Sequence, residues 1–193
     1  CLFTYGGMYL VCNSNLLYHA SVPLNEDGSF KHVRIGKKEY WGHKLLQKTD
    51  QLIRTAYFDE DGSKEKNFAL DYMWYMWCGP DAPSFDKDKM ATFERYFIAD
   101  KALHKESKGY YYTLRNRADI CDNILAEFGV EPGPHSHIIN GHVPVKIIKG
   151  ERPIKADGKL LVIDGGFSKA YQPETGIAGY TLVYHSHGMQ LVQ

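Results

Sequence analysis

The chain has 193 residues, which is enough for one domain with a sizeable hydrophobic core. Its 23 Lys and Arg residues balance its 23 Asp and Glu residues, so the formal net charge is zero, which argues against a broad electrostatic surface for nucleic acid. No apolar run approaches the roughly 20 residues that a membrane-spanning helix needs.

Cysteine and aromatic content place the chain among ordinary globular proteins. The four cysteines form no C-x-x-C pair, so a cysteine-type zinc site is not expected. Reduced thiols in a cytoplasmic protein are the simplest interpretation. Aromatic residues make up 13% of the chain, which indicates a well-filled core rather than disorder.

The first predicted element is a β-hairpin. Residues 8–12 and 16–19 are runs of strand length, and Asn13, Ser14 and Asn15 between them suit a turn. His19 therefore falls at the end of a strand.

The middle of the chain changes to the period of a helix. Residues 40–57 carry an apolar stripe, and residues 68–77 are apolar almost all round, which predicts a buried helix. The tyrosines at 110–112 suit either a strand or an aromatic surface. A further helix is predicted from an N-cap at Asn116 to a stop at Gly129.

The period returns to that of strands after residue 132. Strands are predicted at 137–140, 143–148 and 159–163, followed by a hairpin of 180–184 and 189–192. Strands, then helices, then strands indicate an α+β fold in which a helical insertion interrupts a sheet region. We place the sheet regions at 1–36 and 132–193 and the insertion at 37–131.

Two histidines stand where predicted strands end. His142 follows Gly141 after the 137–140 strand, and His19 ends the 16–19 strand. A buried strand that runs into a loop often holds a site rigidly, and neutral imidazole is a good ligand for Mn, Fe or Zn. The alternative for each is a hydrogen-bonded packing histidine. Only the fold can bring together residues so far apart in the sequence.

Several cationic and hydroxyl residues suit a phosphate group. Arg95 stands among aromatic residues, and its planar guanidinium can bind phosphate bidentately or pair with Glu94. Lys169 can reach a sugar phosphate, with Ser168 and Tyr171 as hydroxyl partners; a solvated lysine is the alternative.

Three further residues near the predicted strands are weaker candidates. His135 and His137 could chelate a metal because alternate strand residues share a face, although a loop end with a solvent-facing histidine is the simpler interpretation. Asp164, which follows the 159–163 strand, suits an orienting role or the capping of a turn.

Several long strings resemble the C-terminal part of class III fructose-1,6-bisphosphatases, a bacterial branch of the calcineurin-like metallophosphoesterases. They are VCNSNLLYH at 11–19, TFERYFI at 92–98, GHVPVK at 141–146, PIKADGKLLVIDGGFSKAYQ at 153–172 and TGIAGYT at 175–181. Three earlier motifs of such enzymes, Asp-x-His, Gly-Asp-x-x-Asp and Gly-Asn-His-Asp/Glu, do not occur in the chain. The resemblance therefore implies a C-terminal part that lacks half of the metal site.

The resemblance implies a fold that is part of a β-sandwich flanked by helices. It also implies a parent enzyme of gluconeogenesis that hydrolyses fructose 1,6-bisphosphate with two metal ions, which we expect to be manganese. It implies that His19 and His142 are metal ligands, and Arg95, Ser168, Lys169 and Tyr171 are our candidates for substrate contacts. No catalytic residue of its own is assigned to the chain, and the isolated chain is expected to be inactive.

Two other functions stay open from the sequence. One is a non-catalytic interaction module that uses the helical middle, and the other is a phosphoesterase of the same fold with another phosphoester substrate. Neither a nucleic acid nor a membrane is an expected partner. Half of a sandwich would expose apolar surface where the missing half packs. Self-association into a homo-oligomer is therefore a further expectation.

Overall fold

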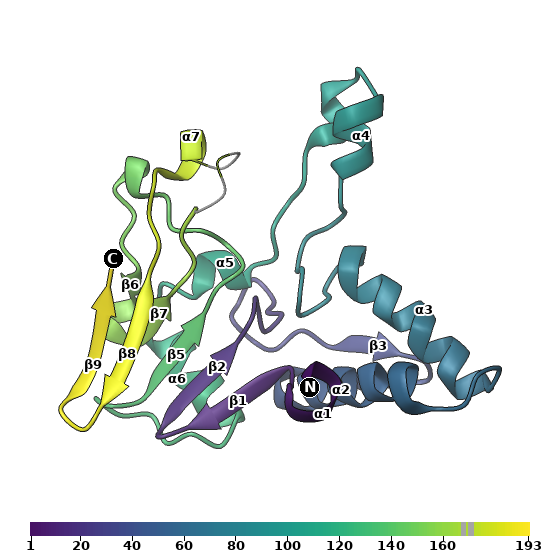
Figure 1. The fold of residues 1–193 in the computed structure, drawn as a ribbon, viewed down its shortest axis with the longest axis horizontal. Helices are drawn as coiled ribbons and strands as arrows, with labels where there is room; N and C mark the ends of the chain where they lie inside the picture. The colour runs from purple at the N-terminus through teal and green to yellow at the C-terminus, as the bar shows by residue number, and fades with distance from the viewer. Residues whose placement is uncertain (167–168, 170–171) are drawn as a thin grey trace. The chain divides into compact units, whose positions relative to one another are not determined.

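The computed structural model describes residues 1–166, 169 and 172–193, which form a mixture of helices and strands (Figure 1). The chain divides into two compact units, Cys1–Tyr9 with Ser21–Leu114, and Leu10–Ala20 with Arg115–Gln193. The α+β class is confirmed, and the predicted boundaries of the sheet regions and the insertion stay a prediction. None of the described helices has both the length and the apolar content that crossing a membrane requires.

A five-stranded sheet with the order β1-β2-β5-β7-β6 is the framework of the second unit. Its strands are β1 (Tyr9–Cys12), β2 (Asn15–Tyr18), β5 (His137–Asn140), β6 (Ile154–Lys155) and β7 (Leu160–Val162). Strands β2, β5 and β7 are parallel, and Leu16, Ile138 and Leu160 lie side by side in register. All three side chains are almost fully buried, so the predicted strands at 16–19, 137–140 and 159–163 form the core of this sheet.

The remaining elements of this unit are short, apart from one helix. Helix α6 (Ala118–Glu127) buries Ile120, Cys121, Ile124 and Leu125 and packs against β5. The chain also forms η2 (Ile147–Lys149), η3 (Ala156–Gly158) and α7 (Gln172–Thr175). The predicted final hairpin is confirmed as β8 (Thr181–His185) and β9 (Gly188–Val192).

The first unit is mainly helical. It contains α1 (Leu2–Tyr5), β3 (Val33–Ile35), β4 (Lys38–Tyr40), α2 (Gly42–Phe58), α3 (Lys64–Cys78), α4 (Thr92–Phe97), η1 (Lys101–His104) and α5 (Tyr111–Leu114). Helices α2 and α3 pack together over Leu45, Leu52, Ala69 and Met76. The hydroxyls of Thr49 and Tyr72 are 3.0 Å apart inside this contact, so the polar groups that the two helices bury satisfy each other.

Helix α3 exists as predicted, but the prediction that it is buried all round is wrong. Ala69, Tyr72 and Met76 are buried, whereas Trp74 is 62% exposed and Trp77 is 52% exposed. Helix α2 packs on one face of α3, and the other apolar face reaches the surface.

Three local predictions are also corrected. Residues 143–148 are not a strand, because the backbone turns at His142 and Pro144 has no amide hydrogen for a ladder. The tyrosines at 111 and 112 are neither strand nor surface, since both are buried in α5. Helix α6 has Arg117 rather than Asn116 as its N-cap, without a side-chain capping bond.

Asp86 makes the first unit sensitive to pH. This carboxyl is 3% exposed, and its Oδ2 atom has no hydrogen-bond partner among the described residues. Burial raises the pKa of Asp86 to about 6; Asp81 adds to the rise, while Ser21 and Lys31 oppose it. The carboxyl therefore holds its proton more strongly in the folded state than in the unfolded state.

We predict that the free energy of unfolding falls as pH rises from well below 4 to well above 6, by roughly 3 kcal/mol in total at 1.36 kcal/mol per pKa unit. Urea unfolding at several pH values measures this fall. Asp86→Asn should remove it, and Asp59→Asn, at the exposed end of α2, is the control. The same pH dependence in Asp86→Asn would contradict this assignment.

Candidate metal centre

His19 and His142 meet at one end of the sheet in the second unit. The Nε2 atom of His19 lies 3.1 Å from the Nδ1 atom of His142, and the two ring planes are 72° apart. His19 directly follows β2, and His142 follows β5 by two residues. Because β2 and β5 are parallel neighbours, their carboxyl ends lie at the same edge, and the fold brings the two predicted residues together.

The separation of the two nitrogens fits two ligands of a single metal ion. Two nitrogens that each lie about 2.1 Å from a tetrahedral or octahedral ion are about 3.0 to 3.4 Å apart. The observed 3.1 Å lies in this range. It also fits a hydrogen bond between the rings, in which one nitrogen donates a proton to the other. Metal binding therefore requires that both facing nitrogens lose their protons and that each ring keeps its proton on the opposite nitrogen.

Backbone bonds around the histidines hold the two strand ends in place. The amide of Gly141 donates to the carbonyl of His19 at 2.9 Å, which extends the β2–β5 pairing beyond the strands. The side chain of Asn140, which is 1% exposed, donates from Nδ2 to the carbonyl of Ala20 at 3.1 Å. The chain on both sides of the histidine pair is thus fixed by buried polar contacts.

His142 has an unusual backbone conformation. Its φ angle is +66°, in the left-handed region that non-glycine residues rarely adopt. Such a conformation costs of order 1–3 kcal/mol, persists only where the surroundings enforce it, and is common at functional sites. The turn after Gly141 therefore brings the imidazole to His19 at an energetic cost to the backbone.

Asp164 lies beside the histidine pair. Burial raises the pKa of its carboxyl, and the charge of His19 opposes that rise, so the two groups interact. A Cβ atom built on Gly141 would lie 3.7 Å from the Cβ of Asp164. The Asp164 carbonyl accepts from the amide of Val145 at 3.0 Å, which ties the loop after β7 to the loop that carries His142. Asp164 is thus placed to act on His19 electrostatically.

The described residues do not form a complete metal site by themselves. Within residues 1–166, 169 and 172–193, no group of three or more His, Cys, Asp or Glu side chains could hold a metal ion. His19 and His142 fit two positions on one ion, and the remaining ligands would come from elsewhere.

The predicted phosphate-binding residues fall in different units of the chain, and two of them lie outside the described residues. Arg95 lies on α4 in the first unit, where its guanidinium donates to the carbonyl of His104 at 3.1 Å and pairs with Glu106 at 3.4 Å. Lys169 is exposed in a turn. Ser168 and Tyr171 lie outside the described residues. Substrate contacts by these four residues stay predictions.

His135 and His137 lie at the opposite end of the sheet from His142. The Nδ1 atom of His137 is 2.9 Å from the carbonyl of Gly158, so this nitrogen carries a proton and donates it. Both residues line an open cavity of about 500 Å³ with His185, Asn13 and other polar residues. His135 is exposed and His137 is half-buried, and chelation of a metal by this pair stays a prediction.

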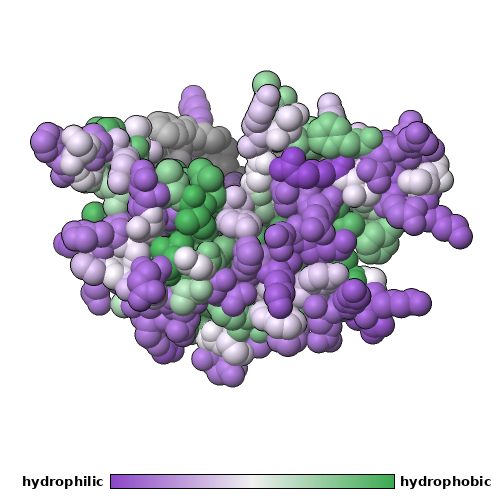
Figure 2. Space-filling model, turned by 90° about the horizontal axis from the view of Figure 1, so that it is seen from below, coloured by the Kyte–Doolittle hydropathy of each residue, from purple (hydrophilic) through white to green (hydrophobic). Residues whose placement is uncertain are grey.

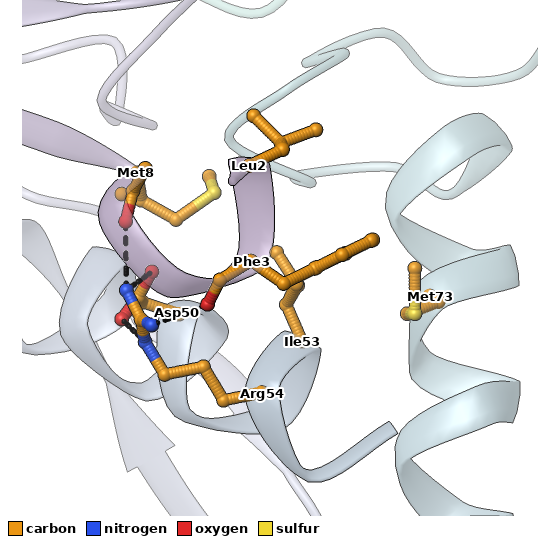
Figure 3. Close-up of a pocket in the computed structure, with 9 residues that line it drawn as sticks. Leu2, Phe3, Met8, Asp50, Ile53, Arg54 and Met73 are labelled. Carbon is orange, nitrogen blue, oxygen red and sulfur yellow. Dashed lines mark hydrogen bonds and ion pairs between the residues drawn. The ribbon is translucent and has the colours of Figure 1, made fainter. Parts of the chain in front are cut away.

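An apolar cavity in the first unit is unsuited to phosphate, although it contains an arginine. This cavity of about 350 Å³ lies between α1, α2 and α3 and is lined by Leu2, Phe3, Met8, Ile53 and Met73 among others (Figure 3). The guanidinium of Arg54 is fully engaged: it binds Asp50 at 2.7 Å and donates to the carbonyls of Phe3 at 2.6 Å and Gly6 at 2.7 Å. Arg54 therefore attaches α1 to α2, and the cavity offers mainly apolar surface.

Comparisons with known proteins agree over the whole chain. A model of the family described as Firmicute fructose-1,6-bisphosphatase matches residues 1–193. The chain is 84% identical over 193 residues to a class 3 fructose-1,6-bisphosphatase of Bacteroides fragilis and 82% identical over 193 residues to one of Bacteroides thetaiotaomicron. A class 3 enzyme of Clostridium novyi is 59% identical over 190 residues, which are 98% of this chain and 28% of that protein. No solved structure matches.

The matching relatives are much longer than this chain. The alignment to the Bacteroides fragilis protein covers 100% of the chain but 29% of the relative, and the same shares hold for Bacteroides thetaiotaomicron. The chain therefore spans less than a third of the length of the curated relatives that it matches.

We predict that Mn²⁺ added to the 193-residue chain binds weakly and acts on His19 and His142 together, because two imidazoles are an incomplete ligand set. Paramagnetic broadening of the histidine ring signals in NMR spectra measures this effect. His142→Ala should abolish the broadening at His19, whereas His135→Ala should leave it. Tight binding by calorimetry would mean instead that the chain completes a metal site by itself.

Proposed function

Because the chain belongs to the Firmicute fructose-1,6-bisphosphatase family, we propose that it supplies part of an enzyme that hydrolyses fructose 1,6-bisphosphate to fructose 6-phosphate and phosphate. The reaction belongs to carbohydrate metabolism, and specifically to gluconeogenesis, in the cytoplasm. Since the chain spans 29% of the length of such relatives, the activity is proposed for a longer protein of which this chain forms the C-terminal part.

The approach of His19 to His142 is the observation that carries this proposal. Two residues far apart in the sequence lie 3.1 Å apart at the carboxyl ends of adjacent parallel strands, at a spacing that suits one divalent ion. We propose that His19 and His142 hold such an ion, with manganese as the expected metal. A divalent ion in a phosphatase activates a water molecule and offsets the charge of the phosphoryl group.

The chain's own contribution is to present two imidazoles in a fixed geometry. The Gly141–His19 backbone bond and the left-handed turn at His142 set the positions of the rings before any ligand binds. The carboxyl of Asp164 places negative charge beside His19, which favours a cationic occupant of the site. Preorganisation of this kind lowers the cost of assembling a metal site.

We propose Arg95, Ser168, Lys169 and Tyr171 as contacts to the sugar bisphosphate. Guanidinium and ammonium groups suit phosphate oxygens, and hydroxyls suit either phosphate or sugar. For Arg95, half of the side chain is exposed beside Glu106, so it could exchange a protein partner for a phosphate without a large rearrangement. We also propose that the longer protein forms a homo-oligomer.

The proposed fold is part of a calcineurin-like sandwich. The sheet β1-β2-β5-β7-β6 supplies one layer, with α6 packed against β5. The hairpin β8–β9 belongs to a second layer in this proposal, and other strands of that layer come from the rest of the longer protein.

The 193-residue chain alone should release no phosphate from fructose 1,6-bisphosphate with Mn²⁺ present. The reason is that the described residues offer two metal ligands and no third one within reach. A phosphate-release assay on the purified chain tests this prediction. Metal-dependent turnover that His142→Ala abolishes would show that the chain is an enzyme without further sequence.

The longer protein should lose activity when either histidine is replaced. A suitable protein is a chimera in which this chain takes the place of the matching 29% of the Bacteroides fragilis relative. We expect His19→Ala and His142→Ala to reduce Mn²⁺-dependent phosphate release by about a hundredfold or more, in the range seen when groups acting directly on the reaction are removed. His187→Ala, at the exposed β8–β9 turn, is the control.

Substrate profiling of the chimera completes this test. Preferential hydrolysis of fructose 1,6-bisphosphate over other phosphomonoesters supports the proposed substrate. Full activity in His142→Ala would refute the role of the histidine pair, and efficient hydrolysis of another phosphoester with none of the sugar bisphosphate would refute the substrate.

A further inference from the structure

Asn140 is a polar side chain that is buried between the ends of two neighbouring strands. Hydrophilic residues cover most of the face of the molecule that Figure 2 presents, as expected for a protein surface. Asn140, by contrast, is the last residue of β5 and is 1% exposed. Its register partners, Tyr18 on β2 and Val162 on β7, are buried as well. A buried amide costs free energy unless it is hydrogen-bonded, so the contacts of Asn140 indicate its role.

The side chain of Asn140 reaches across to the segment that follows His19. Its Nδ2 atom donates to the carbonyl of Ala20, the residue after His19, at 3.1 Å. Since a carbonyl can only accept, this contact fixes which end of the amide faces Ala20. The backbone carbonyl of Asn140 accepts from the amide of Ile163 at 2.9 Å, one residue before Asp164. Asn140 therefore joins the ends of three strands where each strand leaves the sheet.

Two successive carbonyls after β2 are held by the chain of β5. The carbonyl of His19 accepts from the amide of Gly141, and the carbonyl of Ala20 accepts from the side chain of Asn140. The first contact continues the strand pairing, and any residue except proline at position 141 has the amide for it. The second contact exists only because residue 140 carries a side-chain donor. Together the two contacts fix both peptide groups that follow His19.

We propose that Asn140 is a positioning residue of the candidate metal centre, because its side chain sets the separation of His19 and His142 at a value that one divalent ion can span. The proposal rests on the proposed function in taking the histidine pair as a metal site. Asn140 acts through the Ala20 carbonyl on the strand end that carries His19, while its own chain leads through Gly141 to His142.

The two imidazoles cannot maintain this separation by themselves once they are ready to bind a metal. A hydrogen bond between the facing nitrogens needs a proton on one of them, and metal binding requires that both lose it. Two facing lone pairs then repel each other, so the rings would move apart on a loose backbone. A contact that does not depend on protonation has to hold them together, and the bond from the neutral amide of Asn140 to Ala20 is of this kind.

NMR spectra of the metal-free 193-residue chain test the proposal without any activity. Asn140→Leu keeps the approximate size of the side chain and removes the donor. We expect the nuclear Overhauser effect between the rings of His19 and His142 to disappear in this variant. The amide of Gly141 should exchange with solvent about tenfold faster or more, read relative to the amide of Ile138 within β5, because the pairing that protects it opens locally.

Asn15→Leu is the matched control. Asn15 is also a buried asparagine, 4% exposed, and its Nδ2 atom donates to the carbonyl of Asn13 at 2.8 Å. It begins β2, whereas His19 follows the end of that strand, so Asn15 and Asn140 lie at opposite ends of the β2–β5 pair. Loss of the Asn15 donor should also lower the free energy of unfolding in urea, but it should leave the ring contact and the relative exchange of the Gly141 amide unchanged.

The affinity of the chimera for Mn²⁺ is the second measurement. The chimera contains the rest of the Bacteroides fragilis relative, and the electron paramagnetic resonance signal of free Mn²⁺ gives the Kd. Loss of a group that orients a metal ligand typically weakens metal binding by about tenfold to a hundredfold. We expect Asn140→Leu to raise the Kd by this factor and Asn15→Leu to leave it unchanged.

Two outcomes would overturn the proposal. The first is an unchanged ring contact and an unchanged Kd in Asn140→Leu. The second is an equal effect of Asn140→Leu and Asn15→Leu, which would mean that Asn140 only stabilises the fold. If Asn140→Leu does not fold, Asn140→Asp takes its place, because an ionised carboxylate of nearly the same shape cannot donate to Ala20.

The proposed function can fail separately from this role of Asn140. A chimera with asparagine at position 140 that releases no phosphate from fructose 1,6-bisphosphate would contradict the proposed function. The ring contact and the Mn²⁺ affinity are measured without substrate, so the expected changes in Asn140→Leu would still support Asn140 as the residue that positions the histidine pair.

Discussion

The parallel pairing of β2 with β5 is the constraint on which the candidate site depends. Leu16, Ile138 and Leu160 fill three neighbouring strands in register, and their burial fixes that register, since a shift by one residue would turn each apolar side chain to the other face. His19 and His142 follow from this pairing, because each stands just beyond the carboxyl end of its strand. The position of the site is therefore a consequence of core packing rather than of any contact between the histidines.

Strand identity and the ends of the strands could be read from the sequence because each signal was local. The apolar runs before His19 and His142 are short and are bounded by turn residues, and the structure has strands at both places. The contact between the two rings could not be read, since no periodicity reports which strands become neighbours. The family resemblance implied that both histidines bind metal and therefore lie close together. The structure then placed their facing nitrogens 3.1 Å apart.

The wrong predictions have a common physical cause. Helix α3 is apolar on faces that the described residues leave exposed, and the tyrosines of α5 are buried although their sequence suits a surface. In both cases the pattern reports how much apolar surface a segment has, and not which neighbour covers it. The left-handed conformation of His142 was not predicted, because a positive φ angle at a histidine leaves no signature in hydrophobic periodicity. Asp164 was seen only as a group at a strand end, and its interaction with His19 needed the fold.

The left-handed backbone at residue 142 limits how the metal preference of this site could be re-engineered. Among residues with a side chain, Asn, Asp and His adopt this conformation several-fold more often than others, and bulky or β-branched residues avoid it. Exchange of His142 for aspartate would therefore keep the turn, whereas exchange for glutamate or cysteine would set the new ligand against the backbone. The backbone conformation at residue 142 therefore restricts which ligand side chain can stand there. It disfavours a softer ligand such as a cysteine thiolate even when no metal is bound.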